Sequence, residues 1–387
     1  MKLSTNLESI FGGIYSCPRC HVCTFGPWPE NQGFCPIFER GQTFTASAGG
    51  ILHCAKAVLG KRMDYNQAFA DLAFTCTACG ACDKKCVIPR SINPDMAVSD
   101  MIRLIRYELV KRGFAPPGPV KKMYEAVQAN GDLPGKEVGK AVEIPTAVQN
   151  DKADTLFVLE PVHTDGEGKS LEAAFNLLGK MKKKINVLSY AGSYGSTLYD
   201  FGFWDQLPGV VENKWKAIKS HGNKKLLFFD PHTQEFVTNK YRLITDNFSP
   251  FKGLHFSELL LDAFKKGNLE GKEMARIKVS YHDPCFLGRG LGIYDAPRKV
   301  LGHVGADVVE MKRNREQSLC CGSRGVGNYF ENFAKDTARE RIKEFKETKA
   351  DVLITACAYC KDIFEKVMGT ETDRVKDLTE FVNERTS

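Results

Sequence analysis

The chain has 387 residues, which is too long for one ordinary hydrophobic core and predicts two or three domains. Its 43% hydrophobic and 26% charged residues are typical of a globular protein, and the +7 charge comes without the long Lys/Arg tract that a nucleic-acid partner requires. No apolar run reaches the roughly eighteen residues of a membrane-spanning helix. The chain shows no secretory signal, so its fourteen cysteines are expected in a reducing compartment, where they predict metal binding and not disulfides.

The first 115 residues are predicted to form a helical domain around nine of the cysteines. Asn93 and Pro94 predict the start of a helix whose apolar face runs from Val98 to Leu109, and Gly113 ends it. The next segment, 116–150, is rich in Pro and Gly and predicts a connector.

After residue 150, short apolar runs alternate with helical segments. The predicted strands are TLFVLEP, INVLS, KLLFFD, IKVSYHDP, ADVVEM and DVLITA. Such alternation predicts α/β units with mainly parallel sheets. The predicted fold class is therefore α+β multidomain: an all-helical domain, then α/β domains at 151–270 and 271–387.

The two α/β parts resemble each other, as in LLFFDPHTQ and LITACAYC. The alignment places Tyr190 and Ala191 at a Cys-Cys pair of the second copy, and Pro231 and Gln234 at its C-x-x-C pair. An internal repeat whose first copy lacks metal ligands is predicted; generic α/β similarity is the alternative.

One cysteine group has ferredoxin spacing. In the run Cys76, Cys79, Cys82 and Cys86, the first three cysteines suit one cubane and the fourth suits a second cubane. Zinc is the alternative, but zinc sites usually pair two C-x-x-C knuckles.

The partner group is Cys17, Cys20 and Cys23, followed after an insertion by Cys35. Crosswise ligation predicts two cubane [4Fe-4S] clusters, one on Cys17, Cys20, Cys23 and Cys86, the other on Cys76, Cys79, Cys82 and Cys35. Cys54 is left over and is predicted to be a buried free thiol, or a substitute for Cys35 or Cys86.

A second cysteine constellation follows the predicted strands of the last part. It consists of Cys285, the pair Cys320 and Cys321, and Cys357 with Cys360. Carboxyl ends of parallel strands meet in one crevice, so these thiols are expected to converge. A zinc site or buried structural thiols are the alternatives.

This constellation resembles the CCG domain of the heterodisulfide reductase family, through HDPC at 282–285, CCG at 320–322 and CAYC at 357–360. The resemblance implies a noncubane [4Fe-4S] cluster on the five thiolates. The whole layout is similar to iron–sulfur subunits of heterodisulfide reductase, anaerobic glycerol-3-phosphate dehydrogenase, glycolate oxidase and class II benzoyl-CoA reductase complexes. It implies a dicluster ferredoxin domain at 1–115, a degenerate CCG-like domain at 151–270 and a cluster-bearing CCG domain at 271–387.

The sequence departs from the family pattern at Phe286, where the family often has a His beside the cluster. The Phe side chain has no titratable group to transfer a proton, which weakens the case for proton-coupled disulfide reduction at this site. Arg289 and Arg324 lie near cluster cysteines and are predicted to stabilise added negative charge or bind an anion; ordinary surface arginines are the alternative.

These patterns predict an iron–sulfur electron-transfer subunit of a larger oxidoreductase complex. No dinucleotide fingerprint or P-loop is found, so its partners are expected to be separate flavin or iron–sulfur subunits. The expected location is cytoplasmic, with any membrane contact made through a partner. The alternatives are a catalytic subunit that reduces a disulfide or quinone at the CCG cluster, and a zinc or scaffold protein. No catalytic residue is assigned.

Overall fold

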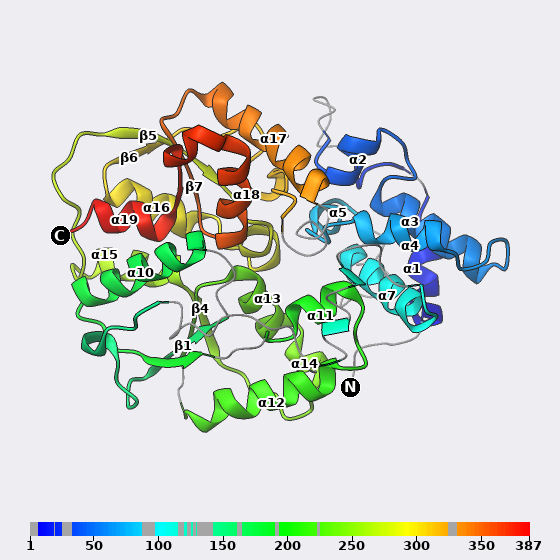
Figure 1. Cartoon of the computed structure of the whole chain (residues 1–387), viewed down its shortest axis with the longest axis horizontal. Helices are drawn as coiled ribbons and strands as arrows, with labels where there is room; N and C mark the ends of the chain where they lie inside the picture. Colours follow the sequence, from blue (N-terminus) through cyan, green and yellow to red (C-terminus); the bar gives the residue numbers. More distant parts are fainter. Residues whose placement is uncertain are drawn as a thin grey trace.

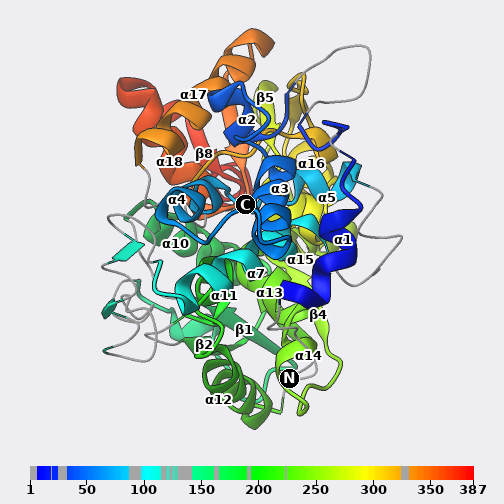
Figure 2. The same ribbon diagram turned by 90° about the vertical axis from the view of Figure 1, so that its right-hand side faces the viewer.

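The fold consists of a helical N-terminal region set against two α/β units (Figure 1). The structure, a computed structural model, describes residues 7–18, 20–24, 33–86, 97–114, 120–121, 125–126, 129, 142–160, 165–189, 193–222, 225–323 and 331–387. Figure 2, with the N-terminal helices towards the viewer, shows that they lie across both α/β units. Within the described part, no helix is both long and apolar enough to cross a bilayer.

The helices of the N-terminal region surround α7. They are η1 (Leu7–Ile10), α1 (Phe11–Tyr15), α2 (Pro36–Gly41), α3 (Ala48–Leu59), α4 (Gln67–Thr75), α5 (Ala81–Lys85) and α7 (Val98–Lys111). Extended Ala97 precedes α7, so the helix does not start at Pro94 as predicted, and Asn93 and Pro94 lie outside the described residues. Gly113 follows its end in the left-handed region, as the sequence predicted.

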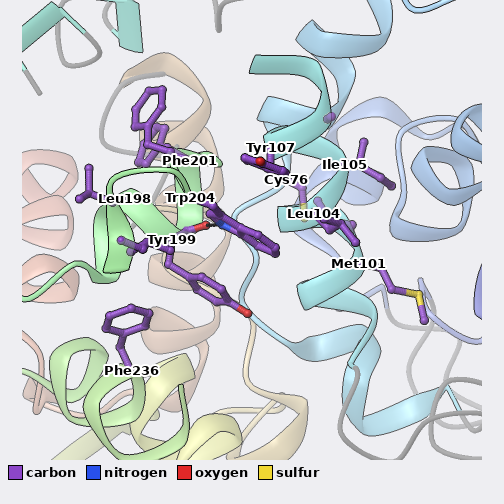
Figure 3. Packing of buried hydrophobic residues seen from close by; sticks show 14 of the residues in the cluster. Cys76, Met101, Leu104, Ile105, Tyr107, Leu198, Tyr199, Phe201, Trp204 and Phe236 are labelled. Carbon is purple, nitrogen blue, oxygen red and sulfur yellow. Dashed lines mark hydrogen bonds between the residues drawn. The ribbon is translucent and has the colours of Figure 1, made fainter. Parts of the chain in front are cut away.

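Helix α7 joins the N-terminal region to the first α/β unit. It packs between α3 and α4 on one side and α11 (Ser196–Phe201) on the other. Gly202 ends α11 with a φ of +77°, and a Cβ there would lie 2.5 Å from the Tyr107 amide nitrogen, so only glycine allows this approach. Trp204 stacks between Tyr107 and Tyr199, with ring centroids 5.4 and 5.2 Å away (Figure 3). The two regions therefore share one apolar core.

Two four-stranded parallel sheets confirm the α/β prediction. The first has the order β2-β1-β3-β4 and the second β6-β5-β7-β8. Their strands are β1 (Thr155–Leu159), β2 (Asn186–Ser189), β3 (Lys225–Phe228), β4 (Lys252–His255), β5 (Ile277–His282), β6 (Ala306–Val308), β7 (Val352–Thr355) and β8 (Val375–Asp377). Only β4 and β8 lacked a predicted counterpart, since KGLH and VKD are short and partly polar.

Helices that cover the first sheet pack against helices that cover the second sheet, and these contacts hold the two units together. Around the first sheet lie η2 (Thr146–Val148), α10 (Asp165–Lys180), α12 (Leu207–Ser220), α13 (Pro231–Asn239), α14 (Tyr241–Ile244) and α15 (Phe256–Lys265). Around the second lie η3 (Phe286–Gly290), α16 (Asp295–His303), η4 (Arg315–Gln317), α17 (Glu331–Thr348), α18 (Ala358–Met368), η6 (Gly369–Arg374) and α19 (Leu378–Glu384). Helix α10 contacts α19, and α15 contacts α16, so a single apolar cluster lies between the sheets.

Equivalent strands of the two sheets are followed by equivalent helix caps. Asp230 is the N-cap of α13 after β3, and Cys357 is the N-cap of α18 after β7. The structural counterparts of Cys357 and Cys360 are therefore Asp230 and Thr233, one residue before the predicted Pro231 and Gln234. Tyr190 and Ala191 lie outside the described residues.

His255, the N-cap of α15, should make stability depend on pH. The residue is buried, and burial lowers the pKa of its imidazole to about 4, while a bond to the Phe229 carbonyl opposes this shift. Below its unfolded pKa of about 6.5 the unfolded chain binds the proton and the folded chain does not, so stability falls with acidification.

We expect acidification from about pH 7.5 to 5 to lower the free energy of unfolding by about 2 kcal/mol through this group alone. His255→Asn keeps a capping side chain and should remove that component. Urea unfolding of both proteins at both pH values measures the difference. Equal losses in the two proteins would contradict the assignment.

Candidate iron–sulfur sites

The structure brings Cys17, Cys20, Cys23 and Cys86 into one group. The first three lie in the loop after α1, and Cys86 ends α5. The pKa of the Cys23 thiol is raised to about 11, chiefly by burial and also by the nearby sulfurs of the other three. The Gly49 amide opposes this by hydrogen bonding to the Cys23 sulfur. We call these four residues the distal group.

Cys35, Cys76, Cys79 and Cys82 form a second set of neighbours, the proximal group. Burial raises the pKa of Cys35, and the Cys76 thiol adds to this effect. Cys76 itself has a pKa of about 11, raised by burial and opposed by the Arg106 charge. Cys23 of the distal group is an electrostatic neighbour of both Cys35 and Cys82, so the two groups adjoin each other.

Buried arginines hold the loops of the proximal group. Arg106 donates to the carbonyl oxygens of Ala73 (3.0 Å) and Cys76, and Arg103 donates to that of Ala78 (3.2 Å). From the second α/β unit, Arg313 donates to the carbonyl of Gly33, two residues before Cys35. The loops are thus fixed by donors from outside them.

The second constellation converges at the carboxyl ends of β5 and β7. Cys285 precedes η3, the Cys320–Cys321 pair follows η4, and Cys357 and Cys360 begin α18. Neighbouring thiols follow one another in the order Cys285, Cys320, Cys321, Cys360 and Cys357, and the Cys321 and Cys360 sulfurs are 3.1 Å apart. All five side chains are buried.

Gly322 explains why a glycine follows the cysteine pair. Its φ is +84°, and a Cβ there would lie 2.8 Å from Cβ of Thr337 on α17. A side chain would push the cysteine loop away from this helix. The same turn directs the Gly322 amide to the Cys320 sulfur at 3.4 Å.

A family model agrees with this convergence. Residues 279–365 match the family described as a cysteine-rich CCG domain. Residues 279–365 therefore form a CCG domain.

Relatives extend the similarity beyond the CCG domain. One subunit of the dihydromethanophenazine:CoB–CoM heterodisulfide reductase of Methanosarcina mazei is 28% identical, over 95% of this chain and 93% of that protein. The probable iron-sulfur-binding oxidoreductase FadF of Bacillus subtilis is 25% identical, over 92% of this chain and 52% of that protein. A probable membrane-anchored ferredoxin of Chromohalobacter salexigens is 26% identical, over 81% of this chain and 48% of that protein.

The CCG domain meets the proximal group directly. Cys79 packs against Cys285 and Cys320, and its thiol interacts with the Cys320 thiol. A cavity of about 170 Å³ opens beside this junction and reaches Cys79, Cys285 and Phe286. The sulfurs therefore form one continuous series from the distal group to the CCG domain.

Arg289 of the CCG domain is only 6% exposed, so the surface-arginine alternative is wrong. Its guanidinium donates to the Cys79 and Ser318 carbonyl oxygens at 2.9 and 2.6 Å. Arg324 lies outside the described residues. Cys54, on α3, has its pKa raised by burial alone, with no other thiol contributing.

His282, which ends β5 inside the CCG domain, was not predicted from the sequence as a site residue. One ring nitrogen and the sulfurs of Cys321 and Cys360 lie within 4.8 Å of one another. Its Nδ1 accepts a hydrogen bond from Arg341 Nε at 3.1 Å, and burial keeps the pKa of the ring well below its usual value. A neutral ring that accepts at Nδ1 carries its proton on Nε2. His282 thus offers a donor, and its place just before Asp-Pro-Cys was the available signal.

The donor set of the CCG domain fits an iron–sulfur group. Its five thiols are buried and form no disulfide. Among the described residues, Nε2 of His282 and Nη2 of Arg289 are buried donors without an acceptor, and both side chains lie near these sulfurs. Sulfides and thiolates would satisfy these donors, and soft sulfur ligands suit iron–sulfur clusters.

Proposed function

We propose that this protein is the iron–sulfur electron-transfer subunit of a larger oxidoreductase complex. The proposal assigns one cubane [4Fe-4S] cluster to the distal group, a second to the proximal group and a noncubane [4Fe-4S] cluster to the five CCG cysteines. The observation that carries it is the contact between Cys79 and Cys320, which makes the cysteine series continuous. When bound, the clusters supply one-electron redox chemistry.

The protein's own residues order and insulate this series. The proximal and CCG sulfurs are largely buried, whereas Cys20 of the distal group is exposed. The distal end is therefore the natural contact point for an external redox partner. The amides of Gly49 and Gly322 donate to cysteine sulfurs, an arrangement that raises cluster potentials.

The proposed partners are flavin or iron–sulfur subunits of a hetero-oligomeric complex. In support, the Methanosarcina relative is named as one subunit of a reductase, and another relative is named EtfAB:quinone oxidoreductase. The proposed location is cytoplasmic, with membrane contact through a partner; the Chromohalobacter relative is named as membrane-anchored.

Metal content tests the proposal. Anaerobically purified protein should contain about twelve irons and as many sulfides per chain, and reduction should develop EPR signals from more than one cluster. About eight irons would contradict the noncubane assignment. Zinc with little iron or sulfide would overturn the cluster proposal as a whole.

A second candidate function is catalysis by the CCG domain on a disulfide or a quinone. The cavity beside Cys79 and Cys285 favours it, because Lys84, Arg103 and Arg289 line this space and could contact a polar molecule. Phe286 also lines this cavity, but its side chain has no titratable group that could supply a proton to a substrate. Turnover of a disulfide with a reduced viologen dye by the isolated chain would establish the catalytic function. Absence of turnover by protein with full iron content favours the electron-transfer role.

A further inference from the structure

Arg289 differs from most of the other buried cations near the cysteines in how its charge is compensated. Arg103 pairs with Asp100 and Asp200, Lys240 pairs with Asp100, and Arg313 pairs with Glu344. Within the described part of the chain, Arg289 makes no ion pair with a carboxylate. Its Nε and Nη1 donate to main-chain carbonyl oxygens, which carry no net charge.

The nearest negative groups available to Arg289 are sulfurs of two different sites. The groups that raise its pKa are the thiols of Cys79, from the proximal group, and Cys285 and Cys320, from the CCG domain, followed by the hydroxyl of Tyr294. Nη2 is buried, and no hydrogen-bond acceptor among the described residues faces it. One positive charge therefore lies between the two proposed cluster sites, with a donor still unused.

Arg106 provides an informative contrast. It too is fully buried and lacks an ion pair among the described residues, but all three of its nitrogens donate to carbonyl oxygens of Ala73, Cys76 and Asp200. Its role is accounted for by holding main chain. Arg289 also holds main chain, through the carbonyl oxygens of Cys79 and Ser318, but its Nη2 donates to no main-chain oxygen.

We propose that Arg289 is the shared charge-compensating residue of the proximal cubane and the CCG cluster, and that it makes reduction of both more favourable. This inference rests on the proposed function. A fixed positive charge in a buried site stabilises the more negative, reduced state of each neighbouring cluster. Since the distal cysteines are not among the largest contributors to its electrostatic environment, the distal cubane should respond least to it.

Redox titration of the full chain, monitored by EPR, tests the inference. In Arg289→Gln, reduction of the proximal and CCG clusters should become about tenfold less favourable, which lowers each midpoint potential by about 59 mV. The distal midpoint should shift least. Arg289→Lys keeps the charge and should restore most of the difference. Arg276→Gln, which removes an exposed cation paired with Asp307, should shift none of the three.

Three outcomes would overturn the inference. The first is an unchanged potential of the proximal and CCG clusters in Arg289→Gln with full iron content. The second is an equal shift of all three clusters, which would indicate a general structural change. The third is an equal shift in Arg289→Lys and Arg289→Gln, because the charge would then not be the cause. Failure of the proposed function is seen separately, as a wild-type protein without three clusters.

Discussion

Replacing Arg103 with alanine should lower the free energy of unfolding by about 3–5 kcal/mol, the loss expected when one partner of a buried ion pair is removed. Its Nε lies 2.6 Å from the Asp200 carboxylate, and Nη1 lies 3.1 Å from that of Asp100. The Arg103 and Asp200 side chains are 5% and 1% exposed, so water cannot replace the lost partner. The pair joins α7 to α11, and its loss also frees the Ala78 carbonyl beside the proximal group.

Chemical unfolding of the variant and wild type, with cluster content checked beforehand, measures this effect. Arg276→Ala is a matched control, because its ion pair with Asp307 has side chains 70% and 46% exposed. That exposed pair should contribute no more than about 1 kcal/mol. Similar small losses for both variants would show that Arg103 does not fix the junction of α7 and α11.

Replacing Cys321 with alanine should remove the proposed CCG cluster, so that iron falls from about twelve to about eight per chain. The Cys321 sulfur is in the middle of the series of five thiols, next to Cys320 and 3.1 Å from the Cys360 sulfur. The EPR signals of the two cubanes should persist. Iron and sulfide analysis together with EPR measures the change.

Cys54→Ala is the matched control for this loss. Cys54 is half-buried on α3, and no neighbouring thiol perturbs it. Iron content and all EPR signals should therefore match those of the wild type. Loss of iron in Cys54→Ala would make it a ligand in place of Cys35 or Cys86, and full iron in Cys321→Ala would refute the five-cysteine site.

The sequence was sufficient to predict six strands and to single out the cysteine motifs, because these are local patterns; the ligand roles of the cysteines stay a prediction. Ferredoxin spacing and apolar runs such as TLFVL do not depend on distant residues. The predicted start of α7 was wrong. Asn93-Pro94 is a good capping signal, but α7 begins at Val98 and does not use it. The predicted alignment of the two α/β copies differs by one residue from the structural one, because the equivalent positions are set by the helix caps and not by sequence similarity.

Contacts between regions could not be predicted from spacing. Arg103 and Asp200 are 97 residues apart, and Arg289 and Cys79 are 210 apart, so only the folded chain brings them together. His282 was missed for a similar reason. Its proximity to Cys321 and Cys360 arises from the pairing of β5 with β7, whereas in sequence its place just before Asp-Pro-Cys is the only signal.

The arginines that reach the proximal group have a consequence for how the protein can be divided. Arg289 and Arg313 lie in the C-terminal α/β unit, yet they hold the main chain at Cys79 and at Gly33, next to Cys35. An excised fragment of residues 1–115 would keep every cubane cysteine and lose both of these supports. The N-terminal region is therefore not an independent module. A chimera that fuses it to another protein must also supply equivalents of Arg289 and Arg313.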